Sequence, residues 1–104
     1  MAQFDVYRND NPETSERFPF VVDVQAELFE KLQSRVVIPL SKAERTGFPM
    51  AYLTPTLSFD GRGYLLMTPQ LAGISTEEIG ARAGSVADQE GAIATAIDFL
   101  LRGF

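Results

Sequence analysis

Hydrophobic and polar residues alternate along much of the chain with the period of two that predicts half-buried β-strands. In the first such segment, Phe4 and Val6 fall on one face, and Asp5 and Tyr7 fall on the other. The segments are separated by polar or turn-forming stretches, of which Asp-Gly-Arg-Gly at 60–63 is the strongest hairpin signal. The strands predicted from this pattern cover residues 3–8, 18–25, 35–40, 51–59 and 64–68, with loops at 9–17 and 41–50.

Three positions complicate this series of strands. Residues 26–34 have good helix propensity but are short, so we expect a long connection with one helical turn. Pro39 lacks a backbone N–H, which predicts that the third strand ends at an edge or a bulge. Residues 75–78 have the form of a capping box for a short helix, whereas the glycines at 80 and 84 favour an extended segment.

From residue 86 onward the hydrophobic period becomes that of an α-helix, and Ser85 is suited to cap its start. Several strands followed by one helix, without βαβ alternation, predict a small α+β or barrel-like domain. One apolar stripe of this helix is expected to anchor it on the sheet. That stripe contains Ile93, Ala96, Ile97 and Leu100.

The end of the sequence is not explained by the anchoring stripe. Leu101 flanks the stripe, and the chain ends in Arg102, Gly103 and Phe104. Glycine after the last helical residue predicts a left-handed cap that turns the following residue aside. An aromatic residue beside an arginine is also typical of a protein-binding hot spot. From the residues alone, a buried terminus and a terminus held out for a partner remain equally open.

Composition excludes several classes of function. The 104 residues suffice for one domain with one core, and they carry a net charge of −5. The nine basic residues are scattered, which argues against direct nucleic-acid binding, although a folded surface can gather dispersed arginines. No apolar run approaches the roughly 18 residues of a membrane span. Without cysteine, a reducing cytoplasm is the expected location.

The chain offers no recognisable catalytic centre. It contains neither histidine nor cysteine, which excludes a Ser-His-Asp triad, a histidine base and zinc–thiolate chemistry. The acidic neighbours Glu77 and Glu78 are interpreted as a solvated first turn, and Asp23 with Glu27 as surface charge. We therefore expect no cofactor and no metal. Nucleases built on Arg, Thr and Glu alone remain open, but no spacing here favours one.

Five segments together resemble the CcdB family, plasmid and chromosomal toxins that poison DNA gyrase and are neutralised by the antitoxin CcdA. The resemblance covers the whole chain, and the pair VDVQ and VIPL is its most specific part. The segments are QFDVYRN at 3–9, FVVDVQ at 20–25, RVVIPL at 35–40, LMTPQLAGI at 66–74 and AIDFLLRGF at 96–104.

The resemblance implies a fold and a set of partners. The implied fold is α+β: an SH3-like antiparallel barrel or sheet with a small accessory sheet and a C-terminal helix, in a single domain over 1–104. The implied molecule is a cytoplasmic homodimer that presents both helix ends on one surface. It inserts that surface into the gyrase A subunit and traps the cleaved-DNA complex, so it is an inhibitor rather than an enzyme.

The resemblance also assigns gyrase-contacting positions to the connection after the second strand and to the helix end. The best-known member of the family has a tryptophan where Arg102 stands. Arginine is itself a stacking and hot-spot residue, so contact there is still expected. The gyrase-binding residues implied are Leu28, Phe29, Asp98, Leu101, Arg102, Gly103 and Phe104.

Two alternatives compete with gyrase poisoning. One is an mRNA endoribonuclease toxin, because a related toxin family shares the barrel; the acidic net charge counts against it. The other is a homologue that binds its antitoxin but has lost the gyrase target, which the arginine at position 102 motivates. Cleavage of long RNA would identify the first, and antitoxin binding without an effect on gyrase would identify the second.

Overall fold

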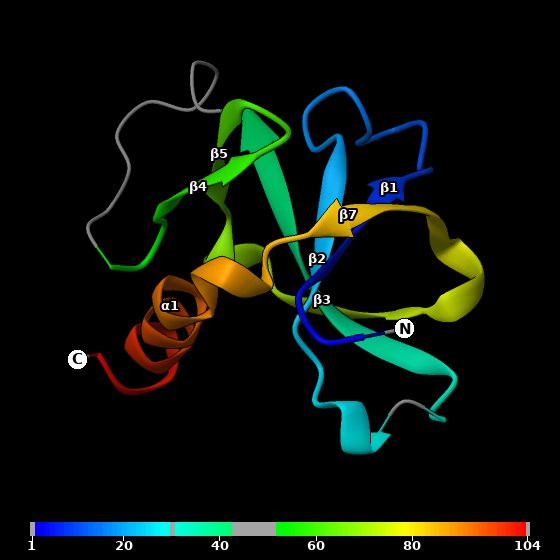
Figure 1. Ribbon diagram of the computed structural model, residues 1–104. Coiled ribbons are helices and arrows are strands. Elements are labelled where there is room, and N and C mark those ends of the chain that lie inside the picture. Colours follow the sequence, from blue (N-terminus) through cyan, green and yellow to red (C-terminus); the bar gives the residue numbers. More distant parts are fainter. Residues whose placement is uncertain (1, 30, 43–51, 104) are drawn as a thin grey trace.

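The computed structural model describes residues 2–29, 31–42 and 52–103. Within these residues the chain forms seven strands, four short 3-10 turns and one α-helix (Figure 1). The strands are β1 (Asp5–Asn9), β2 (Phe20–Asp23), β3 (Ser34–Lys42), β4 (Thr56–Phe59), β5 (Arg62–Leu66), β6 (Ala72–Ser75) and β7 (Ile79–Ser85). The turns are η1 (Glu27–Phe29), η3 (Thr68–Gln70), η4 (Thr76–Glu78) and η5 (Ala87–Gln89), and α1 covers Glu90–Arg102.

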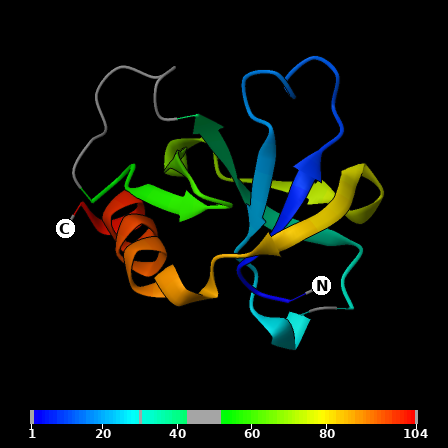
Figure 2. The same cartoon turned by 45° about the horizontal axis from the view of Figure 1, so that its top comes forward.

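All of these strands pair antiparallel in one curled sheet. Their order is β4-β5-β3-β2-β1-β7, and β6 pairs with β3 beside this path. The sheet curls into a half-barrel, and α1 lies beside one end of it (Figures 1 and 2). The predicted α+β, SH3-like class is therefore confirmed. The strands expected in a separate accessory sheet are joined to the main sheet through the long strand β3.

Pro39 lies inside β3, so the prediction that it ends a strand at an edge or bulge was wrong. Its partner across the ladder is Val21 of β2. On its other side β3 changes partner, because β6 pairs up to Val37 and β5 begins at Leu40. The Pro39 carbonyl accepts the Met67 N–H over 2.9 Å at this junction. A missing donor costs no ladder hydrogen bond where the neighbouring strand changes.

The two faces of the sheet carry two apolar clusters, as the alternation predicts. Phe20, Val22 and Val24 share a face, and Val22 is fully buried in the main core with Val6. Tyr7 lies on the opposite face in a smaller cluster. The residues of the smaller cluster are Tyr7, Val21 and Val37, with Ile74 and Ile79 packed against them.

The helix is anchored chiefly by its first half. Ile93 and Ala96 are fully buried in the main core, and Ile97 is partly buried against it. Leu100 is only half-buried and is not among the described residues that pack against that core, so the anchoring that the described residues show comes from Ile93, Ala96 and Ile97. A straight helix leaves a curved sheet as it extends, and α1 projects away from the half-barrel towards its end (Figure 1).

The turn predictions are mostly confirmed. The β4–β5 hairpin has positive φ at Asp60 (53°) and Gly61 (76°), as its sequence predicts. The single helical turn expected in residues 26–34 is η1. Ser75 caps η4 by accepting the Glu77 N–H, but the chain then extends as β7, so the two readings of this segment each hold in part. The predictions for residues 43–51 lie outside the described residues.

Candidate functional site

The last turn of α1 presents an exposed mixed surface. Leu101 is apolar, yet 75% of its surface is exposed. Asp98 and Arg102 are also exposed, and Arg102 ends the helix, where a cation complements the negative end of the helix dipole. The structure therefore brings together three residues that the resemblance assigns to gyrase binding.

Gly103 ends α1 in the left-handed conformation predicted for it. Its φ is 80°, and its N–H donates to the Phe99 carbonyl over 2.9 Å. Among the described residues, leaving out its chain neighbours and the backbone of its own helix, no atom lies within 4 Å of where a Cβ would stand, so backbone conformation rather than crowding explains the glycine here. Phe104, the remaining predicted contact at this end, lies outside the described residues.

An aromatic residue far away in the sequence extends the surface beside the helix end. The ring of Tyr52 lies 6.1 Å from the ring of Phe99, centroid to centroid. Tyr52 is 65% exposed and has a positive φ of 71°. Sequence reasoning missed Tyr52, because residues 51–59 were predicted to form a strand interrupted by Pro55, whereas the strand begins only at Thr56.

A second exposed apolar surface lies on the connection between β2 and β3. Leu28 and Phe29 lie in η1, with 85% and 50% of their surfaces exposed. Leu32 follows and is 54% exposed. Three large apolar side chains this close together on an exposed turn indicate an interaction surface. Leu32 was not among the predicted contacts; the helix-like spacing of 28, 29 and 32 was the signal that could have identified it.

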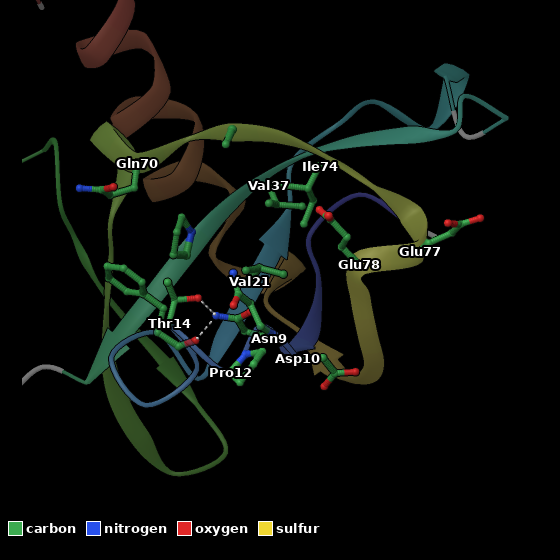
Figure 3. Close-up of a pocket in the computed structure, with 14 residues that line it drawn as sticks. Asn9, Asp10, Pro12, Thr14, Val21, Val37, Gln70, Ile74, Glu77 and Glu78 are labelled. Carbon is green, nitrogen blue, oxygen red and sulfur yellow. Dashed lines mark hydrogen bonds between the residues drawn. The ribbon is translucent and has the colours of Figure 1, made fainter.

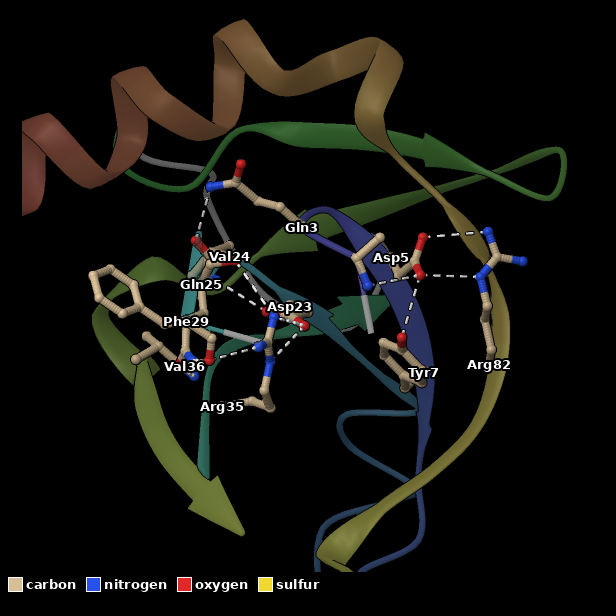
Figure 4. A network of polar contacts seen from close by, with 11 residues as sticks. Gln3, Asp5, Tyr7, Asp23, Val24, Gln25, Phe29, Arg35, Val36 and Arg82 are labelled. Atoms are coloured by element: carbon tan, nitrogen blue, oxygen red, sulfur yellow. Dashed lines mark hydrogen bonds and ion pairs between the residues drawn. The ribbon is translucent and has the colours of Figure 1, made fainter. Parts of the chain in front are cut away.

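A buried ion pair lies directly beneath this connection (Figure 4). Arg35 and Asp23 have fully buried side chains, and their charged atoms are 2.6 Å apart. The Arg35 guanidinium also donates to the backbone carbonyls of Phe29 and Gln25. Asp23 was predicted to be surface charge near Glu27, which was wrong, because β3 brings a cation against it from the neighbouring strand.

The two exposed surfaces are separate on one copy of the chain. In Figures 1 and 2, the end of α1 and the cyan turn η1 lie at different ends of the molecule. The predicted gyrase-binding residues therefore form two groups rather than one continuous site. A single partner that contacts both groups has to reach around the protein or to meet more than one copy.

A pocket of about 600 Å³ opens on the face of the smaller apolar cluster (Figure 3). Val21, Val37 and Ile74 form part of its apolar floor. The loop after β1 forms one wall, held in place because the Asn9 side-chain amide donates to Thr14 and to the Phe18 carbonyl. Acidic residues stand on the rim: Asp10, Glu77 and Glu78.

A second hollow, of about 520 Å³, gathers two of the scattered arginines. Arg8 and Arg82 line it together with Asp60 and Asp88. Arg82 forms an ion pair with Asp5, in which its Nε and Nη2 lie 3.1 and 3.2 Å from the two carboxylate oxygens. Folding does bring dispersed arginines together here, but equal numbers of acidic side chains line the same hollow.

Asp5 is held in its ionised form by this pairing. Burial raises the pKa of Asp5, but the hydrogen bonds and charge of Arg82, the Ala2 N–H and the Tyr7 hydroxyl outweigh burial and leave the pKa below its ordinary value of 3.8. Burial, followed by the charge of Asp5, raises the pKa of Tyr7. The Asp5–Arg82 pair joins strand β1 to strand β7, its neighbour in the sheet.

Neither a metal centre nor a membrane span is visible in the described parts of the chain. Across residues 2–29, 31–42 and 52–103, no three His, Cys, Asp or Glu side chains are grouped to hold a metal ion. Over the same ranges no helix is long and apolar enough to cross a membrane.

Comparison with solved structures supports the fold. An endoribonuclease in complex with its cognate antitoxin, from a Mycobacterial species, is similar to this chain with a TM-score of 0.73. The match covers 97% of this chain and 94% of that one, at 16% sequence identity. Such a likeness establishes a shared fold and leaves the activity open. Comparison with curated proteins gives no match.

Comparison with protein families identifies the chain more closely. The family described as CcdB protein matches residues 3–103, which is essentially the whole chain. The matched region includes β1, the buried β2–β3 pair and the helix that ends at Gly103. The chain therefore belongs to the CcdB family, the toxins of toxin–antitoxin systems.

Proposed function

We propose that this protein binds the DNA gyrase A subunit and traps the gyrase–DNA cleavage complex, without catalysing a reaction itself. The observation that carries this proposal is the exposed apolar surface at the end of α1. Leu101 is 75% exposed on a helix whose first half is buried in the core. A rigid helix that projects an apolar residue beside an arginine has the composition of a protein-binding hot spot.

The chemistry of the molecule supports inhibition by binding. The chain contains no histidine or cysteine. The Gly103 cap ends α1 in a defined left-handed conformation, and a preorganised helix end loses less conformational entropy on docking. Trapping a partner in one conformation requires only tighter binding to that conformation.

We propose further that two copies associate so that both helix ends reach the same target. The half-exposed ring of Phe99 and the exposed Tyr52 supply an apolar surface beside each helix end. Analytical ultracentrifugation of the purified protein is expected to give twice the monomer mass. A species of monomer mass at micromolar concentration would contradict this part of the proposal.

The antitoxin is proposed to occupy the pocket behind the sheet. An apolar floor with Asp10, Glu77 and Glu78 on its rim suits a segment that carries lysine or arginine next to an apolar side chain. The double substitution Glu77→Lys/Glu78→Lys is expected to weaken binding of the cognate antitoxin peptide and to leave gyrase trapping unchanged. Glu90→Lys, an exposed charge reversal on α1, is the matched control.

The test of gyrase trapping uses purified protein, gyrase and supercoiled plasmid. Denaturation and protease treatment are expected to release linear DNA, in amounts that rise with the protein. Deleting Gly103 and Phe104, or replacing Leu101 by Ser, should abolish this without unfolding the domain. Thr95→Ala, at an exposed site on the same helix, should not. Absence of linear DNA with the intact protein would contradict the proposal.

Ribonuclease activity is the competing function, because the hollow with Arg8 and Arg82 lies on a fold shared with an endoribonuclease. Asp60 and Asp88 in the same hollow repel RNA phosphates, and Arg82 is paired with Asp5. Incubation with long RNA is therefore expected to leave the RNA intact. Specific cuts that disappear with Arg8→Ala would favour the enzyme. Antitoxin binding without either activity would identify a homologue that has lost its target.

A further inference from the structure

Several hydrogen bonds hold the described residues of the connection between β2 and β3, which are 24–29 and 31–33. The Phe29 N–H donates to the Ala26 carbonyl over 3.0 Å, and the Leu32 N–H donates to the Phe29 carbonyl over 3.1 Å. The Gln25 side chain spans the connection, because its amide donates to the Phe29 carbonyl and accepts the Val36 N–H. These bonds pair backbone groups that an exposed segment could otherwise leave to water.

The centre of this network is a pair of charges with no access to solvent. Asp23 accepts from both Nε and a terminal nitrogen of Arg35, and its other oxygen accepts the Gln25 N–H over 2.9 Å. The same guanidinium donates to the carbonyls of Gln25 and Phe29, so it ties the segment between β2 and β3 to both strands (Figure 4). Every polar group of the pair is thereby used within a short distance of the exposed turn.

Stability alone gives a poor account of this pair. Burying two charges has a desolvation cost that their attraction roughly offsets, and well-packed apolar replacements of similar size are often at least as stable. What apolar side chains cannot reproduce is the set of hydrogen bonds from the guanidinium to the connection. The network therefore restricts the conformation of the residues above it, which are Leu28, Phe29 and Leu32.

We propose that Asp23, Gln25 and Arg35 are positioning residues, which hold Leu28, Phe29 and Leu32 in the conformation that docks on the partner. Leu32 is thereby a third contact residue of this surface. The inference rests on the proposed function, because the partner is the same gyrase A subunit. A preorganised turn binds more tightly than a loose one with the same side chains, since less conformational freedom is lost on docking.

The main test removes the charges without removing the packing. In Asp23→Leu/Arg35→Met the thermal midpoint should stay near that of the unmodified protein. The Phe29 and Leu32 amides should nevertheless lose protection from hydrogen exchange, and affinity for the gyrase A subunit should fall about tenfold. Unchanged protection of these amides, or unchanged affinity, would overturn the proposal, because a merely structural pair predicts both.

A second variant keeps the test decisive if the double variant does not fold. Gln25→Ala lies at the half-exposed end of the network and leaves the ion pair in place. Like the double variant, it should lower the protection of the Phe29 amide from hydrogen exchange and weaken binding to the gyrase A subunit. The control is Leu57→Ala in β4, which lowers the thermal midpoint by opening the main core. Leu57→Ala should leave hydrogen exchange of the Phe29 and Leu32 amides unchanged. If it lowered their protection as much as Gln25→Ala does, the network would not be holding the connection locally.

The contact role of Leu32 is tested by comparing the gyrase affinities of three single variants. Leu32→Ser should weaken gyrase binding about as much as Leu28→Ser, whereas the neighbouring exposed substitution Lys31→Ala should not. Wild-type affinity in Leu32→Ser would remove Leu32 from the surface. If the unmodified protein binds no gyrase A subunit, the proposed function and the docking role both fail. Hydrogen exchange of the Phe29 and Leu32 amides in Asp23→Leu/Arg35→Met and Gln25→Ala does not depend on gyrase, so it tests separately whether the network holds the connection.

Discussion

Arg102 is the residue on which we expect the strength of the proposed gyrase binding to depend most directly. It is exposed, it is the last residue of α1, and it stands where the best-known member of the family has a tryptophan. A planar guanidinium can stack on a partner, but an indole buries more apolar area at a lower conformational cost.

The corresponding prediction concerns Arg102→Trp. We expect the variant to trap gyrase–DNA complexes at about tenfold lower concentration, because tryptophan dominates protein-binding hot spots. Arg102→Ala should trap less well and should change the free energy of unfolding by no more than about 0.5 kcal/mol, as an exposed site. The measurement is the concentration that gives half-maximal linear DNA. Equal potency of the three proteins would show that this position does not contact gyrase.

Asp5 supplies a prediction about pH. Its pKa is lowered in the folded protein, so its contribution to stability is present above the ordinary value of 3.8 and is lost as the pH falls through the folded-state pKa. Asp5→Asn should therefore be less stable than the unmodified protein at pH 7, and the difference should narrow towards pH 3. Urea unfolding across this range measures it. The control is Asp88→Asn at an exposed site, and a constant difference for Asp5→Asn would contradict the prediction.

At the scale of elements, α1 divides into a buried half and a projecting half. Ile93→Ala should lower the free energy of unfolding by about 2–5 kcal/mol, because this side chain is fully buried in the core. Leu100→Ala should cost clearly less, since Leu100 is half-buried. Denaturant unfolding of both variants ranks them. A larger loss for Leu100 than for Ile93 would mean that the second half of the helix is the anchor.

Strand β7 makes a close approach that only glycine allows. A Cβ on Gly80 would lie 2.7 Å from the Arg8 carbonyl oxygen and 2.7 Å from an Asp10 carboxylate oxygen. Gly80→Ala should therefore destabilise the protein by about 1–3 kcal/mol. It should also weaken antitoxin binding, because Asp10 stands on the pocket rim. Gly73→Ala in β6, with no atom within 4 Å, is the matched control and should be tolerated. Equal thermal midpoints for the two variants would contradict this assignment.

At the scale of the whole molecule, the two partners are expected to respond differently to salt. The protein carries a net charge of −5, and acidic residues surround the pocket proposed for the antitoxin. The surfaces proposed for gyrase combine Leu28, Phe29 and Leu101 with one acid and one base, Asp98 and Arg102, so they carry no excess charge. Raising the salt concentration to about 1 M, where screening acts over about 3 Å, should weaken antitoxin binding much more than gyrase binding. Calorimetry with each partner measures this, and equal salt dependence would contradict the charge-based pocket.

The local pattern of residues accounts for most of the elements. Alternation predicts the strands around Val6 and Val22, and the Asp60–Gly61 pair predicts the hairpin that the structure contains. The period of α1 and its left-handed cap at Gly103 are also readable from sequence, because both depend on neighbouring residues. The family resemblance identified the exposed residues Leu28 and Leu101, which periodicity alone left undecided.

Only the tertiary structure decided which distant groups meet. Asp23 pairs with Arg35 because β2 and β3 lie side by side. Pro39 is tolerated inside β3 because the strand paired with β3 changes next to it. Leu100 is less buried than Ile93 and Ala96, because α1 projects away from the curled sheet towards its end. Periodicity reports the environment of each residue along its own segment, and it carries no information about the register between segments. The sequence by itself therefore determined most of the elements and, through the resemblance, the family. The fold decided that the helix end is exposed and which buried charges lie beneath the exposed connection.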